Sequence, residues 1–147
     1  RDIPNLRYGL QVMNEATRLY PTVAAIGRAA VKDDESFGYE LKAETITVIN
    51  ISGLHHHPAY WQNPFEFMPE RFEHFELKGD NRYIFMPFGA GPRICIGNNF
   101  AMMEMQLINA ILAARVDMEL VSNEVAPEPL ITLKPQGGVI MKLKKVN

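Results

Sequence analysis

The feature that most constrains this chain is the stretch FMPFGAGPRICIGNNF at residues 85–100, which holds Cys95, the only cysteine among 147 residues. Gly91 and Gly97 stand on either side of the cysteine, and glycine lets a backbone turn sharply and come close to a flat, bulky group. A helical pattern begins at about Asn98, so the cysteine lies just before a helix N-terminus. Amide groups and the helix dipole at such an end stabilise an anion, here a thiolate. The stretch therefore predicts a thiolate loop that is backed by a helix.

A lone cysteine is by default a small buried hydrophobe, and this interpretation suits Cys95 when its neighbours are ignored. Its neighbours favour a different role. Arg93 adds a fixed positive charge within reach of an acidic ligand group, and Phe88 adds an aromatic ring. Such a loop suits a single thiolate bound to a soft or redox-active metal. A zinc site formed by the histidines at 55–57 together with Cys95 or His74 is disfavoured, because the separations are irregular and adjacent histidines cannot all point the same way.

Two periodic patterns predict the major helices. The first begins near Asp2 and ends at Pro21, with its inward positions at helical spacing: Leu6, Leu10, Met13, Thr17 and Tyr20. The second follows the cysteine loop, and its main apolar stripe is Phe100, Met103, Leu107, Ile111 and Ala114. Because this second helix is apolar on nearly two faces, we expect it to be deeply buried.

The remaining chain predicts short strands and one long coil. A buried strand is expected at 22–31, and a hairpin is expected between YEL at 39–41 and TITVINIS at 45–52. Near the C-terminus a strand DMEL is expected, followed by a hairpin of LITLKP and VIMKL around a turn at 136–138. Residues 55–88, here named the aromatic coil, follow no period, yet they include five aromatic residues that need burial: Trp61, Phe65, Phe67, Phe72 and Phe75. These patterns together indicate an α+β chain.

The segment FGAGPRICIG at residues 88–97 reads as Phe-x-x-Gly-x-Arg-x-Cys-x-Gly, and it resembles the haem-binding signature of the cytochrome P-450 monooxygenases. Two further motifs of that family occur in this chain in the same order as in the family, and they support the resemblance. EATR supplies Glu15 and Arg18, and FMPERF supplies Arg71. The resemblance implies that residues 1–147 are the C-terminal haem-binding portion of a single, mainly α cytochrome P-450 domain whose distal half is absent.

The resemblance also implies roles for individual residues. Cys95 is similar to the axial thiolate ligand of the haem iron, whose electron donation favours cleavage of the O–O bond of oxygen. Arg93, and less directly Arg28, match residues that pair with the haem propionates. Phe88 matches the aromatic residue beside the ligand, and the loop glycines match those that shape the loop. The residues implied to bind the cofactor, haem, are Cys95, Arg93, Phe88, Gly91, Gly97 and Arg28. No catalytic residue is implied within this span.

The implied activity is that of a haem–thiolate monooxygenase, which inserts one oxygen atom of O2 into an apolar organic substrate, with a fatty-acid-like molecule as the candidate. A separate flavin or iron–sulfur protein would supply the electrons. The sequence leaves two interpretations of Lys78 and Arg82: they belong to a docking surface for an acidic electron donor, or they belong to a solvated edge. The alternative function is a non-catalytic haem-binding module or an inactive truncated product.

Composition and net charge limit which other partners and which cellular location can be expected. The net charge of -2 argues against a general nucleic-acid binder, which is usually basic. No apolar run approaches the roughly 18 residues that a membrane span requires, so we expect no span in this chain. One cysteine excludes an internal disulfide and suits a reducing compartment, so we expect a cytoplasmic location, with a membrane anchor upstream of the chain as the alternative.

Overall fold

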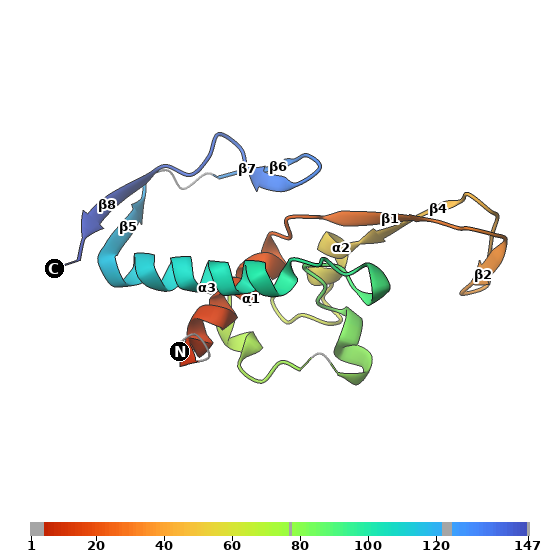
Figure 1. Cartoon of the computed structure of the whole chain (residues 1–147), viewed down its shortest axis with the longest axis horizontal. Helices are drawn as coiled ribbons and strands as arrows, with labels where there is room; N and C mark the ends of the chain where they lie inside the picture. The colour runs from red at the N-terminus through yellow and green to blue at the C-terminus, as the bar shows by residue number, and fades with distance from the viewer. Residues whose placement is uncertain (1–4, 77, 122–124, 147) are drawn as a thin grey trace.

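The computed structural model describes residues 5–76, 78–121 and 125–146, and its centre is a pair of helices. Helix α1 spans Arg7–Leu19 and helix α3 spans Asn98–Arg115, and the two pack against each other (Figure 1). Helix α1 buries Glu15, Arg18 and Leu19. Both major helices are confirmed, although the predicted start of the first, near Asp2, lies outside the described residues.

The prediction that the second helix is deeply buried is wrong. No side chain of α3 is fully buried, and the predicted stripe is exposed: Phe100 is 63% exposed and Ile111 is 50% exposed. Helix α1 covers one side of α3, while the apolar residues on its other faces meet no described neighbour that removes them from solvent. A stripe of apolar residues therefore identified a helix correctly but did not report which partner covers it.

The strands form four antiparallel pairs, and the predicted hairpins are partly wrong. The first long strand, β1 (Ala25–Ala29), pairs with β4 (Ile46–Asn50), in a register that places Gly27 opposite Val48. YEL is β3 (Tyr39–Leu41), and it pairs with β2 (Asp34–Ser36) instead of β4. The turn of this pair is Phe37–Gly38, where both residues have positive φ, as a two-residue hairpin requires. Phenylalanine rarely takes this conformation, so the sequence carried no clear signal of the turn.

The C-terminal strands also pair differently from the prediction. β5 (Val116–Leu120) pairs with β8 (Met141–Lys145), and β6 (Pro127–Pro129) pairs with β7 (Leu133–Pro135). Gly137 and Gly138 do form a turn with positive φ, but it connects strands of two different pairs. Turn glycines thus located the reversal correctly, whereas the strand partners were set by longer-range contacts.

The aromatic coil forms the apolar core of the described chain. It follows the short helix α2 (Ile51–His55) and is shaped by two 3-10 turns, η2 (Pro69–Phe72) and η3 (Gly79–Tyr83). Trp61, Phe72, Ile84 and Phe85 are buried as one cluster, and Phe75 packs against it. The expected burial is confirmed for Trp61 and Phe72 and in part for Phe75, but not for Phe65 and Phe67, which are 78% and 52% exposed. None of the helices in the described ranges is long and apolar enough to cross a lipid bilayer.

Candidate functional site

Two arginines share one buried glutamate between α1 and the aromatic coil. The Arg18 guanidinium donates to both oxygens of Glu15, at 2.7 Å and 2.9 Å, and Arg71 Nε donates to Glu15 Oε1 at 3.0 Å. Burial alone would raise the pKa of Glu15, but hydrogen bonds from Arg18, the Met68 amide and Arg71 outweigh it and hold the pKa below its usual value. The structure therefore confirms that Glu15, Arg18 and Arg71 form a single buried charge cluster.

The cluster fastens the aromatic coil to α1. Arg18 is fully buried, and its guanidinium also donates to the carbonyls of His55 at 2.7 Å and Pro64 at 2.8 Å. The same group lies 5.2 Å from the centre of the Trp61 ring, as a cation–π contact. Arg71 donates to the carbonyl of Gln62 at 2.9 Å. Because these hydrogen bonds reach backbone carbonyls, they determine the path of the coil that leads to the cysteine loop.

The cysteine loop joins the core to α3 through a short 3-10 turn, η4 (Gly91–Arg93). The Cys95 amide donates to the Phe88 carbonyl at 3.0 Å, which closes the loop, and the Cys95 side chain is exposed. Gly91 has a φ of 70°, and an added Cβ would meet nothing within 4 Å, so the requirement for glycine is conformational. Gly97 has a φ of -87°, and a Cβ there would lie 3.8 Å from the Cys95 sulfur. Only the first of these two predicted glycines needs the left-handed conformation.

A cavity of about 390 Å³, here named the cysteine hollow, lies where the loop faces the end of α1, the strand β1 and helix α3. Its lining residues are Thr17, Thr22, Val23, Ile26, Arg28, Ile51, Pro87, Phe88, Gly89, Arg93, Cys95, Ala101 and Met105. The structure thus brings Cys95, Arg93 and Phe88 together with Arg28, which is far away in sequence. Gly91 and Gly97 shape the loop without lining the hollow.

The hollow combines a thiol, two cations and apolar walls. Arg28 Nη1 donates to the Gly27 carbonyl at 2.8 Å, and neither Arg28 nor Arg93 forms an ion pair with a carboxylate among the described side chains. The walls are mostly aliphatic or thioether groups, for example Ile26 and Met105. A ligand with a flat apolar body and acidic groups at its edge would be complementary to this arrangement.

Sequence reasoning missed part of the wall, including Gly89 and Met105. Gly89 has a φ of 75° and sits between Phe88 and Gly91, so its glycine is required by the backbone. The repeated glycine of FGAG was a usable signal for it. Met105 comes from the helix that follows the loop, and only the packing of that helix brings its side chain to the cavity.

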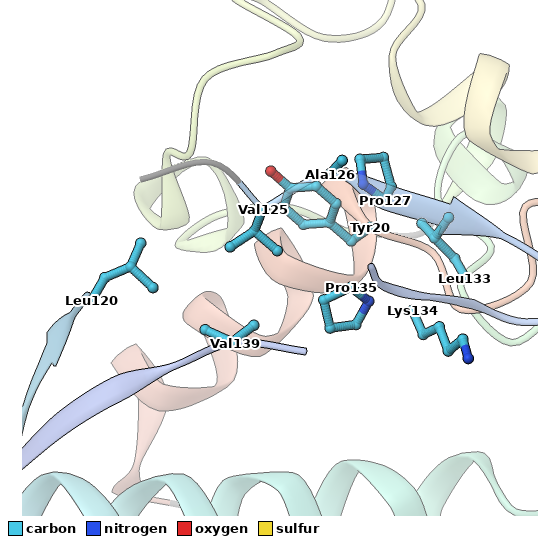
Figure 2. Close-up of a pocket in the computed structure, with 9 residues that line it drawn as sticks. All are labelled: Tyr20, Leu120, Val125, Ala126, Pro127, Leu133, Lys134, Pro135 and Val139. Carbon is cyan, nitrogen blue, oxygen red and sulfur yellow. The ribbon is translucent and has the colours of Figure 1, made fainter. Parts of the chain in front are cut away.

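A second cavity of about 340 Å³ lies between the end of α1 and the C-terminal strands (Figure 2). Its lining is almost entirely apolar and includes Val125, Leu133 and Val139 as well as the ring of Tyr20. The one charged group in the lining belongs to Lys134, whose ammonium pairs with Glu128 at 3.2 Å. This cavity has no thiol and no carboxylate in its lining, so it lacks a soft metal ligand such as the one that Cys95 offers in the cysteine hollow.

The other side chains considered in the sequence, the histidines at 55–57 and the cations Lys78 and Arg82, contact groups outside the cysteine hollow. The His56 ring contacts the Ser52 carbonyl, and His57 accepts from the Ala59 amide, so the adjacent histidines point in different directions. No group of three histidine, cysteine or acidic residues that could hold a metal occurs within the described part of the chain. Lys78 pairs with Glu76 on the surface, and Arg82 lies over the ring of Tyr83. A role for these two cations in docking an electron donor stays a prediction.

Comparisons with known proteins agree along nearly the whole chain. A family model described as Cytochrome P450 matches residues 1–145. The chain is 37% identical to cytochrome P450 4V2 of Homo sapiens over 99% of the chain and 28% of that relative. It is also 37% identical to putative cytochrome P450 132 of Mycobacterium tuberculosis, over 94% of the chain and 30% of that relative. The chain therefore spans less than a third of the length of these relatives.

Solved structures show the same likeness in three dimensions. The crystal structure of the cytochrome P450DA heme domain superposes with a TM-score of 0.81 and 26% sequence identity. The superposition covers 95% of this chain and 31% of that one. The α+β arrangement of two major helices, small antiparallel sheets and a long coil is thus the arrangement found in one part of a larger fold.

Proposed function

Because the chain belongs to the cytochrome P450 family, we propose that its cysteine hollow binds haem and that the protein is a haem–thiolate monooxygenase. Residues 1–147 would then be the C-terminal haem-binding portion of a single domain. The observation that carries the proposal is that Cys95, Phe88, Arg93 and Arg28 line one hollow, although Arg28 comes from a different element. A cysteine, a phenylalanine and two arginines, which a thiolate-bound porphyrin needs, thus line the same cavity.

The donor set of the hollow fits haem. Cys95 offers a single soft ligand, which suits iron held in a macrocycle that already supplies four nitrogen ligands. The apolar wall suits the faces of a porphyrin, and two guanidinium groups suit its two carboxylates. Gly91 leaves open space beside the loop, because an added Cβ would touch nothing within 4 Å. No residue in the lining carries a negative carboxylate that would repel the propionates.

Each of the four residues of the proposed haem site then has a definite role. Cys95 would bind the iron as a thiolate, and the N-terminus of α3 directly after the loop favours that negative charge. Arg93 and Arg28 would bind the propionates and so orient the ring. Phe88 would pack beside the sulfur and exclude water from it. Haem, when bound, supplies the redox-active iron at which molecular oxygen is activated for insertion into a substrate.

The substrate and the partners are part of the same proposal. We propose an apolar organic substrate, with a fatty-acid-like molecule as the first candidate, because Thr22, Val23 and Ile26 in the lining of the hollow are small or apolar. Electrons would come from a separate flavin or iron–sulfur protein. The cytoplasm is the proposed location of this part of the protein.

The test of the proposal is a spectrum of the full-length protein loaded with haem, reduced and exposed to carbon monoxide. A Soret band strongly shifted to the red would report a thiolate ligand, and Cys95→Ser should abolish the shift. Ser36→Ala, in the β2–β3 pair, is the control and should keep it. A red-shifted band that survives in Cys95→Ser would contradict the assignment of Cys95. A normal thiolate spectrum without oxygenated product from any apolar substrate would favour the non-catalytic alternative.

A further inference from the structure

One buried histidine in the core has no task in the proposed haem site. His55 is the last residue of α2, its side chain is fully buried, and it lies between α1 and the segment that leads to the cysteine loop. Histidine is rarely buried completely unless both ring nitrogens have partners. The partners of this ring therefore indicate what the residue does.

Both ring nitrogens of His55 contact backbone groups. Nε2 lies 2.8 Å from the amide nitrogen of Met86, and Nδ1 lies 3.3 Å from the carbonyl oxygen of Arg18. An amide can only donate, so Nε2 must be the unprotonated acceptor. A carbonyl can only accept, so Nδ1 must carry the proton. The two contacts thus select one neutral tautomer of the imidazole.

The Met86 amide, which donates to His55, lies at the base of the cysteine loop. The Met86 carbonyl accepts from the Gly89 amide at 3.0 Å, and two residues after Met86 the Phe88 carbonyl accepts from the Cys95 amide at 3.0 Å. The ring of Phe85 packs against the imidazole, with 5.3 Å between the ring centres. A short path of hydrogen bonds and backbone therefore runs from α1 through His55 to Cys95.

We propose that His55 is a positioning residue for the cysteine loop, because it ties the Met86 amide to α1 and thereby sets where Cys95 faces the hollow. The inference rests on the proposed haem site, which makes the position of Cys95 functionally important. Burial lowers the pKa of His55 to about 4, and the positive charge of Arg18 acts in the same direction. The neutral ring that the hydrogen bonds require is therefore the dominant form at neutral pH.

Two substitutions separate the two ends of the link. His55→Gln can place its carbonyl oxygen near the position of Nε2 and keep the bond from Met86, while it loses the bond from Nδ1 to the Arg18 carbonyl. Residue 55 still stays attached to α1 in this variant, because its backbone carbonyl accepts from the Arg18 guanidinium at 2.7 Å. His55→Asn matches Nδ1, so its amide can still donate to Arg18, but its side chain is too short to reach Met86. Both variants lose the ring contact with Phe85, which makes them matched controls for each other.

The test is hydrogen exchange of the Met86 and Cys95 amides in full-length protein without haem. We expect exchange to rise about tenfold or more in His55→Asn, because the Met86 amide loses its acceptor, and to stay within about threefold of the parent in His55→Gln, which keeps an acceptor for that amide. The haem-loaded His55→Asn should also lose part of its red-shifted carbon monoxide band, while His55→Gln keeps it. Equal exchange in both variants, or a rise spread evenly over the core around Trp61, would overturn the inference.

A measurement on the parent protein covers the case in which His55→Asn does not fold. Nitrogen NMR of His55 should show a protonated Nδ1 and an unprotonated Nε2, with a scalar coupling across the bond from the Met86 amide. The opposite tautomer would overturn the inference. Failure of the parent to give the thiolate spectrum would instead reject the haem site, while exchange and NMR would still decide whether His55 holds the loop.

Discussion

The replacement Arg71→Ala tests whether the buried charge cluster holds the aromatic coil in place. Arg71 is only 11% exposed at its side chain, and its Nε donates to Glu15, which is fully buried. Its two terminal nitrogens donate to the carbonyls of Gln62 at 2.9 Å and Asn63 at 3.3 Å. Nη2 also donates to the carbonyl of Glu66 at 3.5 Å, so the substitution removes one ion-pair contact and three hydrogen bonds between η2 and the preceding part of the coil.

The expected loss can be worked out from what remains. Removing one partner of a buried ion pair costs about 3–5 kcal/mol, because the other charge is left without compensation. Here Glu15 keeps the Arg18 guanidinium and the Met68 amide, so the charge is not stranded entirely. The released carbonyls lie near the surface, where water can replace the lost donors. We therefore expect the lower end of the range, about 3 kcal/mol of the free energy of unfolding.

Urea unfolding of the parent and variant gives this free energy directly, and haem retention after gel filtration gives its functional consequence. Arg82→Ala is the matched control, because Arg82 is exposed and its described side-chain contact is the ring of Tyr83. The control should change stability by less than about 0.5 kcal/mol. If Arg71→Ala also stays within that margin and retains haem normally, the cluster does not hold the coil and the reasoning fails.

Two further predictions concern the pH dependence of folding and the loop glycines. The pKa of His55 falls from 6.5 to about 4 on folding, so the unfolded state takes up a proton first as the pH drops. This proton uptake lowers the free energy of unfolding by about 3 kcal/mol between pH 6.5 and 4, and it has no effect above pH 6.5. A pH series of urea unfolding should show the loss in the parent protein but not in His55→Gln. Gly91→Ala should lower stability by about 1 kcal/mol because of its positive φ, and Gly97→Ala by less, since its φ is negative. Equal losses at the two glycines in urea unfolding would contradict this explanation.

The cysteine loop was predictable because its information is contiguous. Glycines with positive φ, an arginine and a cysteine stand within ten residues, and their spacing alone identifies the signature. The charge cluster was predictable only through the likeness to a family. Glu15 and Arg18 by themselves read as an ordinary surface pair, and nothing in their local sequence indicates that Arg71 completes the site.

Residue periodicity and glycine conformation are local properties, and by themselves they determined the two major helices, the turn at Gly137–Gly138 and the path of the cysteine loop. Which strands pair and which side chains become buried are not local properties. Only the tertiary structure decided that β1 pairs with β4, that Phe72 is buried while Phe65 is exposed, and that Arg28 reaches the hollow of Cys95. The physical reason is that strand pairing and burial depend on which distant surfaces meet, and many pairings have similar local propensities. The double hydrogen bond of His55 is of the same kind, because it exists only once α1 and the loop are both in place.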